Sequence, residues 1–169
     1  LFAAFGVQAA SHGTMNNLSF GDGSRQYYET IAGGGGAGEG FSGSFGLQSH
    51  MTNSRLTDPE VLARRYPVRL ERFARRFGSG GGGRWVGGDG LERTLRFLQP
   101  MQLSLISGSR RIPPMGLNGG GAGACGINSV LRADGTHERL TGSVQLDLAA
   151  GDAITVLTPG GGGFEAEPH

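Results

Sequence analysis

Short runs in which apolar and polar residues alternate make up most of this chain, and glycines separate them. Alternation with a period of two is typical of strands that bury one face. The run 153–157 has apolar residues at both parities, so we predict that both of its faces are buried. In the run 68–75 the alternation is imperfect but still fits an amphipathic strand. The predicted strands are 16–20, 27–32, 68–75, 91–98, 101–107, 128–132, 144–148 and 153–157.

One segment carries the start signal of a helix. Thr57 precedes Asp58-Pro59-Glu60, which supplies an N-cap hydroxyl, a proline near the first turn and a glutamate three residues on. Pro67 disfavours α geometry in the residue before it, so we predict a short helix at about 58–65. Asp134-Gly135, between two short runs, predicts a hairpin. Many short strands and one helix favour a mainly β domain, sandwich- or barrel-like, with long glycine-rich loops.

Glycine is the dominant residue, with 34 in 169, about three times the usual ~7% share. The runs lie at 33–38, 80–83, 119–121 and 160–163, without a collagen-like period. Long polar glycine-rich segments inside domains are usually functional loops or linkers. We expect these runs to line a shared surface. The segment 27–57 also carries aromatic residues, a histidine and an Asn/Thr/Arg cluster, which argues against a linker.

Charge and composition exclude several classes of protein. The net charge is +1, so nothing indicates a nucleic acid or an anionic membrane as partner. No lysine is present, so the run Gly33–Gly38 cannot serve as a P-loop and Schiff-base chemistry is excluded. The single Cys125 cannot form an intramolecular disulfide, which favours a reducing, cytoplasmic compartment. No apolar run approaches the ~18–20 residues of a membrane span.

Ordered blocks along the chain resemble the B-type component of the hydantoinase/5-oxoprolinase family, which also includes the large subunits of acetone and acetophenone carboxylases. The resemblance covers about the C-terminal third of that component. We therefore expect residues 1–169 to be a single mainly β domain, the C-terminal fragment of a larger polypeptide. The blocks are SHGTMNNLSFGD (11–22), YYETIAGGGGAG (27–38), HMTNSRLTDPE (50–60), RYPVRLERF (65–73), GSGGGGRWVGGDG (78–90), SGSRRIPPMGLNGG (107–120) and GDAITVLTPGGGGF (151–164).

The resemblance implies an ATP-dependent hydrolase of cyclic amides such as 5-oxoproline or hydantoin. An A-type subunit or domain would be the partner and would activate the amide carbonyl. ATP and a divalent metal are expected for the full complex, with no cofactor bound by this fragment. The fragment would form part of the active-site wall and a subunit interface, and it would be inactive alone. Homo-oligomers of the protein are also expected.

Two alternatives remain open at this point. One is a non-catalytic scaffold or assembly domain of the same enzyme, or of a related ATP-dependent ketone carboxylase. The other is a stand-alone glycine-rich β domain that binds a small ligand. The sequence does not choose between the hydrolase and carboxylase branches.

Two residues are candidates for catalysis. His50 follows a glycine-rich loop and titrates near neutral pH, so it suits a general base or a ligand-binding donor, or else it holds the loop in shape. Glu29 lies on a predicted strand that leads into the glycines. If it points inward, burial disfavours its charged form and suits it to proton transfer; if outward, it is an ordinary solvated residue.

Polar residues nearby are candidates for substrate binding. Asn16 and Asn17 offer amide donors and acceptors, or form a turn before a strand. Arg55 suits a bidentate contact with a substrate carboxylate, or pairs with Asp58 or Glu60. We predict no metal ligands, because the histidines show no metal-binding spacing. The full set of predicted substrate-binding residues is Asn16, Asn17, Thr30, Thr52, Asn53 and Arg55.

Overall fold

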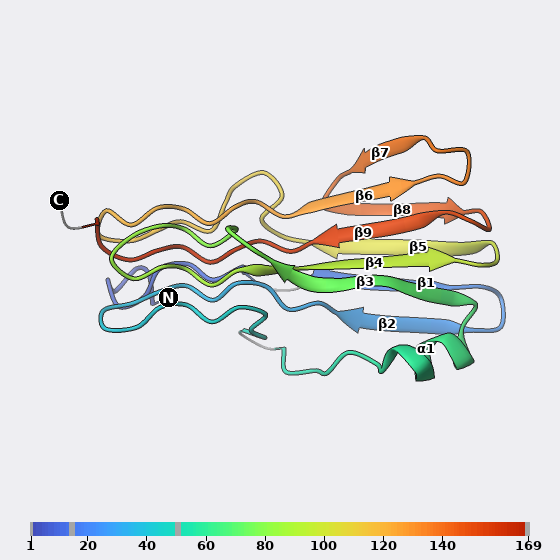
Figure 1. The fold of residues 1–169 in the computed structure, drawn as a ribbon, viewed down its shortest axis with the longest axis horizontal. Coiled ribbons are helices and arrows are strands. Elements are labelled where there is room, and N and C mark those ends of the chain that lie inside the picture. The colour runs from blue at the N-terminus through green and yellow to red at the C-terminus, as the bar shows by residue number, and fades with distance from the viewer. Residues whose placement is uncertain (1, 14–15, 50–51, 168–169) are drawn as a thin grey trace.

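The structure, a computed structural model, describes residues 2–13, 16–49 and 52–167. Within these residues nine strands gather at one end of the molecule, and extended glycine-rich segments fill the other end (Figure 1). The mainly β prediction is confirmed. The elements are β1 (Asn16–Gly21), β2 (Gln26–Thr30), α1 (Pro59–Arg65), β3 (Val68–Arg76), β4 (Gly90–Phe97), β5 (Met101–Ser107), β6 (Ile127–Leu131), β7 (His137–Leu140), β8 (Ser143–Leu148) and β9 (Ala153–Leu157).

The strands form two antiparallel sheets, and no closed barrel is present among the described residues, so the sandwich alternative is the correct one. One sheet has the order β2-β1-β5-β8, and the other has the order β3-β4-β9-β6-β7. Inward side chains of both sheets share one apolar core. Phe20 from the first sheet meets Phe97 from the second edge to face, with ring centroids 5.2 Å apart. Burial of these alternating side chains supplies the main stabilisation of this half.

Two local features refine the sequence prediction. The helix ends at Arg65 as predicted, but it begins at Pro59 and Asp58 is its N-cap instead of Thr57, because the Asp58 carboxylate accepts from the amides of Glu60 and Val61. A register shift between Leu70 and Arg72 interrupts the pairing of β3 with β4. Such a bulge moves the following side chains to the opposite face, which explains the imperfect alternation in 68–75.

The glycine-rich end is a bundle of extended segments whose centre is residues 158–164, all of them buried. The amides of Gly160 and Gly163, three residues apart, donate to the same neighbouring segment, at Ala124 and Gly121. A repeat of three residues is that of a polyproline II-type helix. We call this half the glycine bundle. The other backbone contacts of the central segment are Thr158 N–H to Leu91 O, Gly161 N–H to Gly88 O, Gly162 N–H to Ala10 O, Phe164 N–H to Trp85 O, Gly34 N–H to Pro159 O, Ala37 N–H to Gly162 O, Gly81 N–H to Gly161 O, Trp85 N–H to Phe164 O and Leu117 N–H to Gly163 O.

The glycine runs therefore lie against one another. The runs 33–38 and 160–163 are buried, so the four runs do not together line a surface as expected, although Gly82, Gly119 and Gly121 are exposed. A side chain would prevent this packing: a Cβ on Gly161 would lie less than 3.0 Å from the backbone of Gly35. Only glycine lets backbones approach so closely. Hydrogen bonds between backbone groups stabilise the bundle, whereas packing of apolar side chains stabilises the sandwich.

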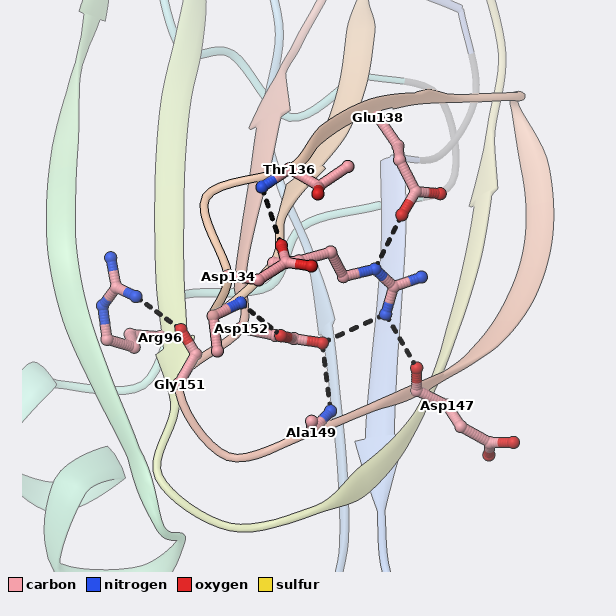
Figure 2. A network of polar contacts seen from close by, with 10 residues as sticks. Arg96, Asp134, Thr136, Glu138, Asp147, Ala149, Gly151 and Asp152 are labelled. Atoms are coloured by element: carbon pink, nitrogen blue, oxygen red, sulfur yellow. Dashed lines mark hydrogen bonds and ion pairs between the residues drawn. The ribbon is translucent and has the colours of Figure 1, made fainter.

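The opposite end of the sandwich is closed by a polar network (Figure 2). Asp152 is buried and accepts from the amides of Ala133 and Ala149 and from the Arg132 guanidinium. Arg132 also pairs with Glu138 at 2.8 Å. These contacts tie the predicted Asp134-Gly135 hairpin, which is confirmed as β6–β7, to the turn between β8 and β9.

Candidate functional site

The sandwich and the glycine bundle meet at His12, which is buried. Its backbone amide donates to Gly34 O in the bundle. Its ring Nε2 lies 2.9 Å from Ser49 Oγ and 3.1 Å from Leu47 O. The ring therefore fixes the segment 47–49, which leads directly into the predicted residue His50.

Asn16, at the start of β1, orients the His12 ring. Its side-chain amide donates to Ile31 O at 3.2 Å and lies 3.3 Å from His12 Nδ1. Its Oδ1 accepts from the Arg110 guanidinium at 2.7 Å. Because an arginine only donates, Oδ1 must face Arg110 and the amide nitrogen must face His12. His12 Nδ1 is then the acceptor, and Nε2 carries the proton, an assignment that follows from this network.

Arg110 completes the junction from the loop after β5. Its Nη1 also donates to Gly108 O, and its Nε and Nη2 donate to Asn128 Oδ1 at 3.2 and 2.8 Å. Burial, and then the neighbouring charge of Arg76, lower the pKa of Arg110 to about 10, so it stays protonated at neutral pH. We call His12, Asn16, Arg110 and Asn128 the junction network. It links positions more than a hundred residues apart in the sequence.

A cavity of about 480 Å³ opens beside this network. Its lining includes the polar residues Ser11, Ser107, Ser109, Arg110 and Arg111. Its other wall is apolar and includes Ile112, Pro113, Pro114 and Met115. A concave site with an apolar wall and a few convergent polar groups is typical of small-molecule binding.

Glu29 points inward, into the sandwich core. Its two carboxylate oxygens accept from Nε and Nη2 of Arg93 at 2.6 and 2.8 Å, and both side chains are 2% exposed. The Tyr27 hydroxyl also donates to Glu29, and burial together with this carboxylate raises the pKa of Tyr27. The carboxylate therefore joins the two sheets through a buried ion pair. Its predicted role in proton transfer stays a prediction.

The other predicted residues are spread over the molecule. Asn17 and Thr30 lie side by side on neighbouring strands, where the Thr30 hydroxyl donates to Asn17 Oδ1 at 3.0 Å. Thr52 donates to Ser49 O at 2.8 Å, whereas Asn53 and Arg55 are exposed. His50 lies outside the described residues. Of the predicted residues, Asn16 belongs to the junction network. The catalytic and substrate-binding roles of all of them remain predictions.

Sequence reasoning missed His12 as an organising residue and Arg110 altogether. Within residues 2–13, 16–49 and 52–167 no group of three or more His, Cys, Asp and Glu side chains is placed to hold a metal ion. We assign no metal ligand there. The block SGSRRIPPM contained the signal for Arg110, since two arginines follow a strand in an otherwise uncharged stretch.

In the same described ranges, no helix is long and apolar enough to cross a membrane.

Comparison with known proteins identifies relatives along nearly the whole chain. The family model described as hydantoinase B/oxoprolinase matches residues 1–166. The 5-oxoprolinase of Dictyostelium discoideum is 46% identical over 164 residues, which are 97% of this chain and 13% of that protein. The 5-oxoprolinase 1 of Arabidopsis thaliana is 48% identical over 164 residues, again 97% of this chain and 13% of that protein. The chain thus spans a small part of the length of these relatives.

Two solved structures have a similar fold. The ATP-dependent caprolactamase from Pseudomonas jessenii superposes with a TM-score of 0.73 at 25% identity, covering 96% of this chain and 30% of the caprolactamase chain. A nucleotide-free acetone carboxylase gives a TM-score of 0.73 at 16% identity, covering 93% of this chain and 26% of the other. The second similarity concerns the fold alone.

Proposed function

The chain belongs to the hydantoinase B/oxoprolinase family, and we propose that it forms part of an ATP-dependent enzyme that opens a cyclic amide such as 5-oxoproline. The 5-oxoprolinase names of its relatives support this substrate class. In this proposal an A-type subunit or domain activates the amide carbonyl with ATP, and this chain forms a wall of the site where the C–N bond breaks.

One observation carries the proposal. The junction network brings the segment 12–16, the loop with Arg110 and the strand with Asn128 together beside a cavity, and the first of them holds Asn16, which the sequence predicts to bind substrate. Asn16 lies in the network itself, and the segment 47–49 is fixed through His12 immediately before His50. Preorganised polar groups on a rigid β scaffold are what a substrate-positioning wall requires.

A second candidate function is a non-catalytic scaffold or assembly domain of the same enzyme, or of a related ketone carboxylase. The Glu29–Arg93 ion pair favours it, because this carboxylate is engaged on both oxygens inside the core. The glycine bundle is stabilised by hydrogen bonds between backbone groups, which likewise suits a structural role. The fold shared with an acetone carboxylase is compatible with the carboxylase branch.

Substitution in the complete protein separates the two functions. His50→Ala removes the candidate base next to the fixed segment 47–49, and the proposal expects the turnover of 5-oxoproline to fall at least about 100-fold while the subunits stay assembled. Turnover and the mass of the complex are measured on the same preparation. Loss of assembly with normal turnover per intact complex would favour the scaffold function instead.

The isolated chain provides a second test. We propose that residues 1–169 alone do not hydrolyse 5-oxoproline with ATP. Measurable ATP-dependent release of glutamate by the purified chain would contradict this part of the proposal and place the whole reaction within these residues.

A further inference from the structure

Arg110 is a largely buried cation whose hydrogen-bond partners are neutral. It donates to two side-chain amide oxygens, of Asn16 and Asn128, and to the backbone carbonyl of Gly108. Nine ion pairs join arginines to carboxylates in the part of the chain that the structure describes, and none of them includes Arg110. Burying a charge without a counter-charge is costly, so an anion bound beside Arg110 would be stabilised by it.

The loop around Arg110 is built to hold the guanidinium in place. Gly126 lies directly against it, and a Cβ at Gly126 would come less than 3.0 Å from the guanidinium carbon and nitrogens. Ser109 adopts a positive φ of 53°, a conformation that costs energy in a residue with a side chain. The carbonyl of Ser109 accepts from the Gly126 amide, which ties the two segments together.

The guanidinium retains a donor for a ligand. Arginine carries five N–H groups, and the contacts with Asn16, Asn128 and Gly108 use four of them. The remaining N–H is on Nη2. Arg111, the next residue, is exposed and lines the same cavity, so it can supply a second, movable guanidinium. No aspartate or glutamate belongs to the cavity lining among the described residues.

The cavity walls restrict the chemistry of the anion. Ser107 and Ser109 line the cavity together with the arginines, and Ile112, Pro113 and Met115 make its lining partly apolar. A nucleotide or another polyphosphate would place further charges against that apolar part, which is unfavourable. A compact, mainly apolar ligand with a single carboxylate suits this lining. Its apolar part can contact the apolar residues, and its carboxylate can pair with an arginine in a fixed geometry.

We propose that the cavity beside Arg110 and Arg111 is a carboxylate-binding site that selects ring substrates bearing a carboxylate. Arg110 supplies a fixed positive charge and one hydrogen bond, and Arg111 closes on the carboxylate. The inference deepens the proposed function, on which it rests for the identity of the ring.

The test compares two ligands that share a five-membered lactam ring and differ in the carboxylate, 5-oxoproline and 2-pyrrolidinone. Binding of each to the complete protein is measured by calorimetry without ATP, so that no turnover is needed. The proposal expects 5-oxoproline to bind at least about 10-fold more tightly than 2-pyrrolidinone. It expects Arg111→Gln to reduce this preference and to leave the binding of 2-pyrrolidinone unchanged, because Arg111 contacts only the carboxylate.

Two further variants make the result specific. Arg139→Gln removes an exposed arginine on β7 and should retain the preference, which controls for net charge. Gly126→Ala keeps both arginines but displaces the Arg110 guanidinium, and should weaken 5-oxoproline binding about 10-fold or more while 2-pyrrolidinone is unaffected. Circular dichroism of each variant confirms that it is folded.

The outcomes separate this inference from the proposed function. If the protein opens 5-oxoproline but Arg111→Gln keeps the full preference for the carboxylated ring, the carboxylate site is overturned and the function stands. If the protein prefers the carboxylated ring through Arg111 but never opens it, the site stands and the proposed function fails. Equal binding of both rings to the unsubstituted protein overturns the site.

Discussion

The sandwich and the glycine bundle are stabilised in different ways within one short chain. In the sandwich, side chains such as Phe97 and Ile154 are fully buried between two sheets. In the bundle, the buried segment 158–164 consists mainly of glycines, and its neighbours are backbone amides and carbonyls. The sandwich depends on apolar area, whereas the bundle depends on close approach and on hydrogen bonds that exclude water.

The difference matters for function because the two regions tolerate change differently. A core of side chains can relax around a smaller or larger residue at a cost of a few kcal/mol, about 1–5 by analogy with other cores. A bundle of contacting backbones has no side chain that can move aside. The candidate site lies where the rigid bundle meets the sandwich, at His12 and Asn16.

The largest expected effect is the loss of the bundle on substitution of Gly161 by alanine. The new Cβ would overlap the backbone of Gly35, which cannot move without breaking its own hydrogen bonds to Ser44 and Gly88. We expect a destabilisation of more than about 4 kcal/mol, seen as loss of soluble protein or a collapse of the thermal unfolding midpoint. Gly23→Ala is the matched control, because a Cβ there meets no atom within 4 Å. A Gly161→Ala protein as stable as Gly23→Ala would contradict the account of the bundle.

The next largest effect concerns the ion pair within the sandwich. Glu29→Gln leaves the buried Arg93 without its counter-charge, and we expect a loss of about 3–5 kcal/mol in the free energy of unfolding. The double variant Glu29→Leu/Arg93→Met removes both charges and should recover most of that stability.

Chemical denaturation measures both variants, and turnover is assayed on the same samples. If the double variant is stable and active, Glu29 is structural. If it is stable and inactive, the predicted catalytic role of Glu29 gains support, and a Glu29→Gln protein of unchanged stability would show that the ion pair contributes little.

A smaller effect is expected at the far end of the sandwich, at Asp152. Burial opposes its ionisation, but the amides of Ala149 and Ala133 and the Arg132 guanidinium outweigh it, so the pKa of Asp152 lies below its ordinary value of 3.8. Because the folded-state pKa is lowered, the stabilisation is complete well above pH 3.8 and is lost as the pH falls through and below that value.

Asp152→Asn should therefore cost about 1–3 kcal/mol at neutral pH and flatten the acid limb of the stability curve below about pH 5. Unfolding followed at a series of pH values provides the measurement. Asp147→Asn is the control at the same end of the sandwich, because Arg132 contacts its backbone carbonyl and not its carboxylate (Figure 2). Parallel curves for Asp152→Asn and the unsubstituted protein would contradict the assigned role.

Alternation of side chains was sufficient to predict most of the sandwich. The run 101–107 became β5 with the predicted bounds, because Met101, Leu103 and Leu105 alternate with outward residues and must face the core together. The bulge after Leu70 was not predictable. An extra residue only makes the alternation of apolar and polar residues irregular, which does not identify the position of a bulge. The glycine bundle was missed because residues without side chains show no periodicity, although their packing is the most restrictive in the molecule.

The candidate site was predictable only in part. Asn16 was chosen because an amide suits a polar substrate, and it indeed lies in the junction network. Its partner Arg110 is 94 residues away, so no local pattern could connect them. Glu29 was chosen for its position before the glycines, but the sequence did not indicate that Arg93 would engage both of its carboxylate oxygens.

The central claim is that the junction network positions the wall of an active site, and Asn16→Asp tests it most directly. The substitution preserves the size of the side chain but removes the N–H that faces His12 Nδ1 and Ile31 O. Gln102→Glu, the same chemical change on an exposed position of β5, is the control. We would measure kcat for ATP-dependent opening of 5-oxoproline by the complete, assembled protein. The account predicts a fall of at least about 10-fold for Asn16→Asp and none for Gln102→Glu. An unchanged kcat for Asn16→Asp would contradict it.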